Sequence, residues 1–136
     1  MTRIQLQIYA DPGGAEVYVN LRRKQDGHER VVAYVDTGAE TSLFPTHFMS
    51  FLDYRLAETS EVIIDQAGIS EQVFTATRAY VWLFLEDAAG AVTPEFEVPV
   101  WFARSDEMLI GFEGILDRAI LHIDMPQRTG WIDINF

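Results

Sequence analysis

The sequence contains no cysteine among its 136 residues. A disulfide framework, a thiolate nucleophile and thiolate ligands for a metal ion are therefore all excluded. Cations are scarce as well, because 10 lysine and arginine residues stand against 21 aspartate and glutamate residues, which makes the formal net charge −11. Nucleic acids and anionic membrane surfaces bind basic proteins, so neither is expected as a partner.

Long hydrophobic runs are also missing. No stretch approaches the roughly 18 apolar residues of a membrane-spanning helix. The first residues, Met1–Ile8, alternate polar and apolar side chains and lack the apolar centre of a signal peptide. We therefore expect a cytoplasmic protein. The length predicts a single domain, residues 1–136, with a real core but without room for two separate lobes.

Motifs for a metal, a nucleotide or an activated serine are weak. The three histidines are scattered and have no close acidic neighbours at ligand spacing, so no metal site is expected. Ser42 has no histidine placed to activate it. The segment Asp11–Gly14 is a turn and not a phosphate-binding loop. No cofactor is predicted.

Alternating polar and apolar residues predict strands along most of the chain. Ile4, Leu6 and Ile8 share one face of a first strand, which turns at Asp11–Gly14. Further strands are expected around Val17–Arg22, Val31–Val35, Val62–Ile64, Val73–Ala79, Tyr80–Leu85, Phe96–Phe102, Ile120–Ile123 and Trp131–Phe136. Pro99 indicates an edge position or a bulge in its strand.

Two segments have helical spacing. After Pro45, Thr46 is a candidate cap for a turn that places Phe48, Phe51 and Leu52 on one face. After Gly111, the residues Phe112, Ile115 and Leu116 have the same spacing. The predicted fold class is therefore all-β, mainly antiparallel, with one or two short helices.

The stretch from Val31 to Pro45 is the most informative one. Five apolar residues end at Asp36, and Thr37 and Gly38 follow. Such a run predicts a buried strand that delivers a carboxylate onto a tight turn. Asp, Thr and Gly are also ordinary turn residues, so a surface turn is the alternative. Apolar residues on both sides of the turn favour a carboxylate held close to the core.

At these residues the sequence resembles the retropepsin-like aspartic proteases. Their active-site loop reads Asp-Thr-Gly-Ala followed by an acid and a threonine, as Asp36–Thr41 does here. A second shared pattern is two hydrophobic residues and a glycine, Leu109–Gly111, which in that family pass behind the catalytic loop. The resemblance covers about residues 31–119. It implies a retropepsin-like acid protease barrel with one lobe per chain, of the single-lobe bacterial type.

The resemblance also implies roles for individual residues. Its catalytic residues correspond to Asp36, Thr37 and Gly38, and its substrate-binding residues to Ala39, Glu40, Leu109, Ile110 and the flap tip Ala67, Gly68 and Ile69. From its pattern alone, the segment around Gly68 is an ordinary hairpin between two apolar strands. Many retroviral members have a basic residue after the second glycine, paired with the acid that follows their catalytic loop. Phe112 stands there in this chain, which leaves Glu40 without that partner.

The implied activity is hydrolysis of peptide bonds by two aspartates that share a proton, one activating water and the other protonating the carbonyl oxygen. The chain contains one Asp-Thr-Gly, so a homodimer would supply the second aspartate. In the resembled family, terminal strands pair across that interface, which would also cover the apolar C-terminal strand. The partner would be a peptide or protein substrate. The alternative is a protease-fold module for dimerisation or peptide binding, with little or no turnover.

Overall fold

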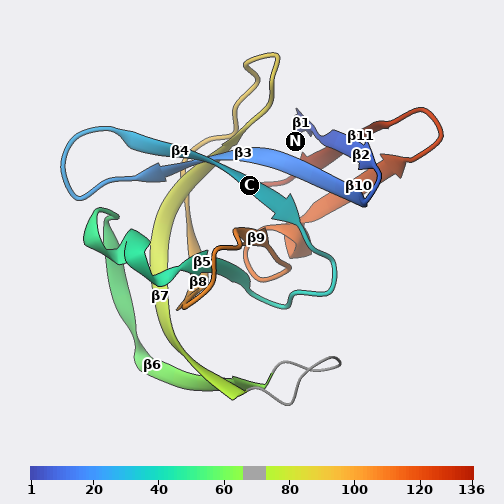
Figure 1. Ribbon diagram of the computed structural model, residues 1–136. Helices are drawn as coiled ribbons and strands as arrows, with labels where there is room; N and C mark the ends of the chain where they lie inside the picture. Colours follow the sequence, from blue (N-terminus) through green and yellow to red (C-terminus); the bar gives the residue numbers. More distant parts are fainter. Residues whose placement is uncertain (66–72) are drawn as a thin grey trace.

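Alternating apolar residues build an all-β fold in the part of the chain that the computed structural model describes, residues 1–65 and 73–136 (Figure 1). Its strands are β1 (Thr2–Gln5), β2 (Gln7–Ala10), β3 (Gly13–Arg22), β4 (His28–Val35), β5 (Ser42–Pro45), β6 (Tyr54–Asp65), β7 (Val73–Glu86), β8 (Phe96–Ala103), β9 (Leu109–Ile110), β10 (Ala119–Asp124) and β11 (Thr129–Ile134). The helices of these residues are two short 3₁₀ helices, η1 (Thr46–Ser50) and η2 (Leu116–Arg118). The predicted fold class is confirmed.

The strands form two sheets. Three antiparallel strands follow the order β1-β11-β10, and eight strands follow the order β2-β3-β4-β9-β5-β8-β7-β6. Strand β3 also pairs with β7, so the six strands β3, β4, β9, β5, β8 and β7 close into a ring. Two pairs, β4–β9 and β5–β8, are parallel, and the other pairs are antiparallel. Inward-facing side chains of this ring make up most of the hydrophobic core.

The alternating N-terminal residues, predicted to form one strand, form two strands. Ile4 belongs to β1 in the three-stranded sheet, whereas Ile8 belongs to β2 in the larger sheet. The chain changes sheet at Leu6, whose N–H donates to the carbonyl of Gly130 at 2.9 Å. Leu6 itself stays buried, so the alternation continues across the break and the sequence shows no interruption.

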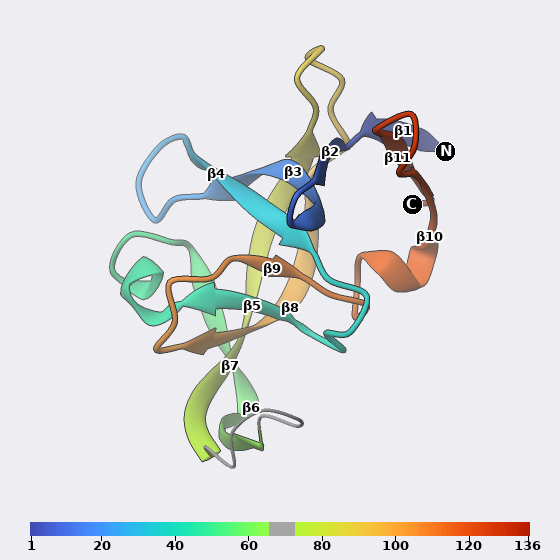
Figure 2. The ribbon, with the colours of Figure 1, turned by 45° about the vertical axis from the view of Figure 1, so that its right-hand side comes forward.

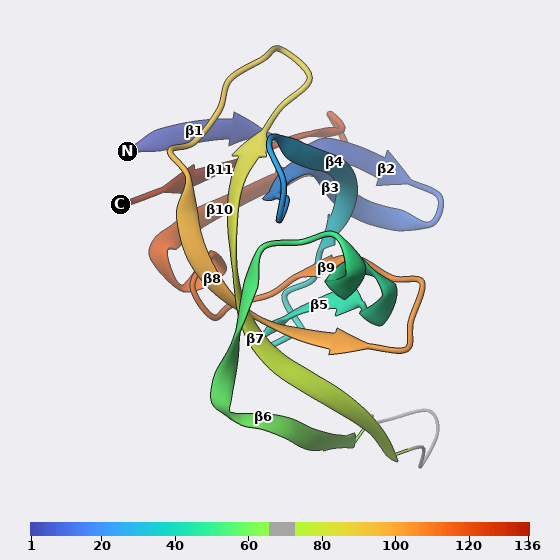
Figure 3. The ribbon, with the colours of Figure 1, turned by 90° about the vertical axis from the view of Figure 1, so that its left-hand side faces the viewer.

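Strands β6 and β7 form a long hairpin, one end of which projects from the rest of the molecule while the other part of β7 belongs to the ring (Figure 3). The two strands predicted at Val73–Ala79 and Tyr80–Leu85 are one continuous strand, β7. The pairing of β6 with β7 shifts register between Leu56 and Glu61. In β8, Pro99 pairs with β7 but precedes the part of the strand that pairs with β5. At Pro99, β8 therefore has a neighbouring strand on one side only, which is the edge position predicted for this proline.

The two predicted helical turns are short 3₁₀ segments. In η1 the cap is Pro45 without a side-chain hydrogen bond, so the prediction that Thr46 caps the helix is wrong. Phe48 and Phe51 pack against the core. Near η2, Ile115 and Leu116 are buried, but Phe112 is 42% exposed and lies outside the core.

The C-terminal strand is covered within its own chain. Ile132 and Ile134 of β11 are buried, and β1 and β10 pair with the two edges of this strand. Phe136, predicted on the same face, is exposed. The apolar strand therefore does not need a second subunit to bury it. Among the described residues, none of the helices has the length and apolar character needed to cross a membrane.

Candidate active site

Asp36 lies immediately after β4, where this strand runs beside β9 (Figure 2). The two strands are parallel, with Val35 opposite Ile110. The pairing extends one residue further, because the Asp36 N–H donates to the carbonyl oxygen of Ile110 at 3.0 Å. The backbone of the aspartate is therefore held by the sheet, and its carboxylate stands at the beginning of the loop.

The turn after Asp36 is closed by the aspartate itself. Its Oδ1 accepts a hydrogen bond from the Gly38 N–H at 2.8 Å, and its carbonyl accepts one from the Ala39 N–H at 3.2 Å. Thr37 and Gly38 are exposed at the tip of the turn. Aspartates commonly close turns in this way, so these two bonds fit an ordinary turn and a catalytic loop equally well.

The packing behind the turn distinguishes this loop from a solvated one. Gly111 lies so close to it that an added Cβ would be 2.8 Å from the Ala39 carbonyl oxygen and 2.8 Å from the Thr41 carbonyl carbon. Backbone atoms cannot move away as a flexible side chain can. Only glycine fits at this position, and the two segments named in the sequence, Asp36–Thr41 and Leu109–Gly111, are in direct contact.

Hydrogen bonds join the same two segments residue by residue. The Gly111 N–H donates to the buried Oγ of Ser42 at 3.0 Å, and the Phe112 N–H donates to the carbonyl of Ala39 at 3.0 Å. The Glu113 N–H donates to the carbonyl of Glu40 at 2.7 Å. Three consecutive amides thus bind the loop from behind, which fixes its backbone relative to β9.

The acid within the loop, Glu40, has no cation partner among the described residues. The side chain of Glu40 is exposed, and within residues 1–65 and 73–136 no lysine, arginine or histidine forms an ion pair with it. Phe112, which occupies the position of the family's basic residue, contributes its backbone N–H only. The ion pair near the loop is instead formed by Arg78 and Glu113. Neither residue was identified in the sequence, since the two are 35 positions apart in no recognisable motif.

Apolar side chains lie beside Asp36 on the outer face of the sheet. Tyr34 of β4 is the register partner of Leu109 in β9, and Leu109 is the partner of Leu43 in β5. Register partners on neighbouring strands point to the same face. Tyr34 is 51% exposed, while Leu109 and Leu43 are partly buried. Asp36 follows Tyr34 by two residues, one position beyond the end of β4, so the row ends close to the aspartate along the chain.

The predicted substrate-binding residues therefore have different environments. Leu109 is accessible on the outer face, whereas the side chain of Ile110 is fully buried and points into the core. Ile110 is placed to hold Asp36 through its carbonyl and not to contact a ligand with its side chain. Ala39 and Glu40 belong to the loop. The predicted flap residues Ala67, Gly68 and Ile69 lie outside the described residues.

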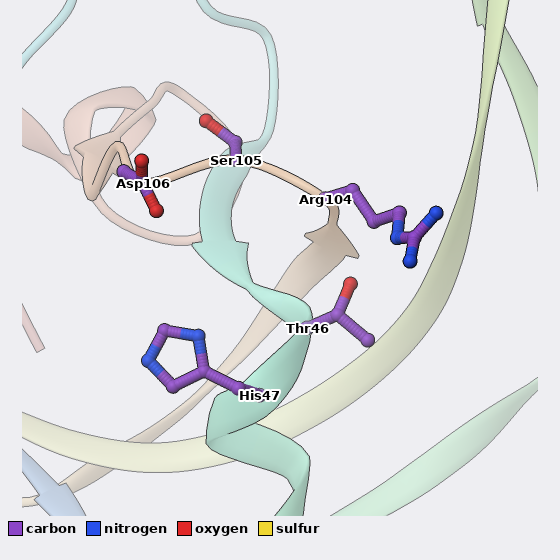
Figure 4. Close-up of a pocket in the computed structure, with 5 residues that line it drawn as sticks. All are labelled: Thr46, His47, Arg104, Ser105 and Asp106. Carbon is purple, nitrogen blue, oxygen red and sulfur yellow. The ribbon is translucent and has the colours of Figure 1, made fainter.

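A pocket of about 460 Å³ lies elsewhere, beyond the ends of β5 and β8 (Figure 4). It is lined by Thr46, His47, Arg104, Ser105 and Asp106. The Asp36 loop leads into the first residue of β5, whereas Thr46, which lines the pocket, follows the last residue of this strand. The pocket and Asp36 therefore lie at opposite ends of β5. The Arg104 side chain extends away from His47 and Asp106. These side chains do not converge on a common point.

The described residues contain no cluster of three or more His, Asp or Glu side chains arranged to hold a metal ion. One chain brings a single Asp-Thr-Gly to the site. No protein-family model matches this sequence, and no curated protein shows significant similarity to it.

Proposed function

We propose that this protein is an aspartic endopeptidase of the retropepsin-like type, in which Asp36 from each of two identical chains forms the catalytic pair. The observation that carries the proposal is the packing of Gly111 against the back of the Asp36 loop. Together with the bond from the Asp36 N–H to Ile110, it holds the aspartate on a fixed backbone at the end of β4. A turn that only connects two strands needs no such support.

In the proposed reaction, one ionised Asp36 takes a proton from a water molecule, and the water oxygen attacks the carbonyl carbon of the peptide bond. The protonated Asp36 of the second chain gives its proton to the carbonyl oxygen. In the collapse of the tetrahedral intermediate, the first Asp36 gives the proton it took from water to the nitrogen, the C–N bond breaks, and the second Asp36 takes back the proton from the hydroxyl, so that an amine and a carboxylic acid leave. Two facing carboxylates do not both ionise cheaply, so we expect turnover to be highest at mildly acidic pH.

The row formed by Tyr34, Leu109 and Leu43 supports a peptide as the ligand. It offers apolar surface next to Asp36, where the side chains of an extended peptide would lie. The same row favours a second candidate, a peptide-binding module without turnover, because apolar binding does not require the carboxylate. The two candidates differ only in what Asp36 does.

Asp36→Asn tests this difference. Asparagine keeps the size of the side chain and an oxygen that accepts the Gly38 N–H, so the loop is expected to stay folded. With a peptide library at several pH values, hydrolysis should fall by about a thousandfold or more, because the proton acceptor is lost. Asp26→Asn, in the exposed loop before β4, is the matched control and should cleave normally.

Two outcomes oppose the enzyme. Cleavage by Asp36→Asn at the wild-type rate would make Asp36 a turn residue. If the wild type and Asp36→Asn are both inert but bind the same peptides equally well, the binding module takes its place. A transition-state-mimicking inhibitor of aspartic proteases should block cleavage by the wild type.

A further inference from the structure

Glu113 holds two consecutive residues of the Asp36 loop. Its Oε2 accepts a hydrogen bond from the hydroxyl of Thr41 at 2.8 Å, and its N–H donates to the carbonyl of Glu40 at 2.7 Å. Thr41 is only 9% exposed. If Glu113 were absent, this hydroxyl would lose its partner in a place where water has little access.

Arg78 fixes the orientation of the Glu113 carboxylate. Its guanidinium pairs with Oε1, the oxygen that Thr41 does not use. The guanidinium also lies over the ring of Trp101, 5.1 Å from its centroid. Both side chains are partly shielded from solvent, with exposures of 25% for Arg78 and 37% for Glu113. Because Trp101 and Glu113 both hold Arg78, the arginine in turn leaves the Glu113 carboxylate little rotational freedom.

The position of Trp101 connects this pair to the row beside Asp36. Trp101 is the register partner of Arg78 in β7 and of Leu43 in β5. Arg78, Trp101, Leu43, Leu109 and Tyr34 therefore form one line of neighbours across five strands. The arginine lies at one end of this line, and the strand leading to Asp36 lies at the other.

We propose that Arg78 and Glu113 are positioning residues for Asp36, and that they act through the hydroxyl of Thr41. The loop carries Asp36 at its first residue and Thr41 at its last, and the two ends of the loop are tied to β9 and to Glu113. Glu113 thereby orders a loop whose own acid, Glu40, has no ion pair within the described residues. The inference rests on the proposed function, because positioning matters only if Asp36 reacts.

Thr41→Val removes the hydroxyl and keeps the shape of the side chain. With a cleaved peptide as substrate, kcat should fall by about tenfold or more while KM changes less than about twofold, because misplaced catalytic groups slow the chemical step more than binding. Thr41→Ser retains the hydroxyl and should restore most of kcat. A Thr41→Val enzyme with wild-type kcat would overturn the proposal.

The double variant Arg78→Glu with Glu113→Arg separates the ion pair from the hydrogen bond. The exchanged charges still attract each other, but arginine has no acceptor for the Thr41 hydroxyl. Thermal stability should therefore recover relative to either single reversal, while kcat stays low. Full recovery of kcat would show that the ion pair alone is sufficient and would overturn the role of Thr41.

Amide hydrogen exchange gives a readout that does not depend on cleavage. In Thr41→Val, the amides of Phe112 and Glu113, which bind the loop, should exchange at least about fivefold faster, and amides of β10 and β11 should not change. If the wild type cleaves no peptide, the proposed function fails, and exchange still decides whether the network orders the loop. Unchanged exchange overturns the inference. Faster exchange with unchanged kcat in an active enzyme also overturns it, because the loop would then be ordered without positioning Asp36.

Discussion

Gly111 lies directly behind the carbonyl group of Ala39, and a Cβ atom at Gly111 would fall 2.8 Å from the carbonyl oxygen. This contact joins the two glycine-containing segments of the chain. It also places the Gly111 N–H against the buried Oγ of Ser42. The loop that carries Asp36 and the turn that follows β9 therefore behave as one packed unit.

Gly111→Ala is expected to destabilise the protein by about 2–3 kcal/mol, because the methyl group forces backbone atoms apart. Thermal or urea unfolding measures the change. Gly14→Ala is the matched control, since no atom lies within 4 Å of its Cβ position, and it should change stability by less than about 0.5 kcal/mol. Equal stability of the two variants would contradict the close packing behind the loop.

A dimer is expected from the single Asp-Thr-Gly and not from the terminal strand, which its own chain covers. Sedimentation at micromolar concentration should show two chains per particle. Turnover per chain should fall on dilution as the dimer dissociates, because each half contributes one carboxylate. A strictly monomeric species that cleaves peptides would rule out the shared catalytic pair.

Tyr34→Ser should weaken substrate binding with little effect on folding. The side chain is 51% exposed beside Asp36, so its loss removes apolar surface from the row without opening a core cavity. We expect KM to rise by about threefold to tenfold for peptides with apolar side chains near the cut. Ile120→Ser is the control, because Ile120 is 59% exposed on β10 in the other sheet. An equal effect of both variants would remove Tyr34 from the peptide site.

Stability should depend on pH through Asp133. Arg3 holds this carboxylate with two hydrogen bonds, at 2.7 and 2.8 Å, between β1 and β11. These hydrogen bonds lower the pKa of Asp133 below its ordinary value, and they raise the pKa of Arg3. A carboxyl group with a lowered pKa stabilises the fold fully above its ordinary value of about 3.9, and this stabilisation is lost as the pH falls through the lowered pKa.

Urea unfolding of the wild type and of Asp133→Asn between about pH 5 and pH 2 measures this contribution. The wild type should lose more stability on acidification than the variant, which has no proton to gain at this position. At pH 7 the variant should be the less stable of the two. Parallel pH profiles would show that the Arg3–Asp133 pair contributes nothing to stability.

Local patterns in the sequence predicted most of the strands, although not where each begins and ends. Alternation identified β3 through Val17, Val19 and Leu21, and it identified the core face of β11 through Ile132 and Ile134. These predictions hold because each side chain along a strand faces the core or the solvent in turn, whatever the partner strand is. The continuous apolar run before Asp36 predicted a buried strand, and this part of the prediction is wrong: Ala33 is buried, but Val32 is 46% exposed and Tyr34 is 51% exposed.

The tertiary structure alone decided which segments meet. The chain changes sheet at Leu6, whose amide still binds Gly130 of the first sheet while Gln7 already pairs in the second, and the alternation around Leu6 is unbroken. Ile110 turns its side chain into the core, and Phe112 turns outward, although both lie in one apolar segment. Arg78, Glu113 and Thr41 come together from three separate parts of the chain. A local sequence pattern indicates which side chains are buried. An ion pair or a hydrogen bond between distant residues depends on how the strands are aligned with one another, and local patterns do not indicate that alignment.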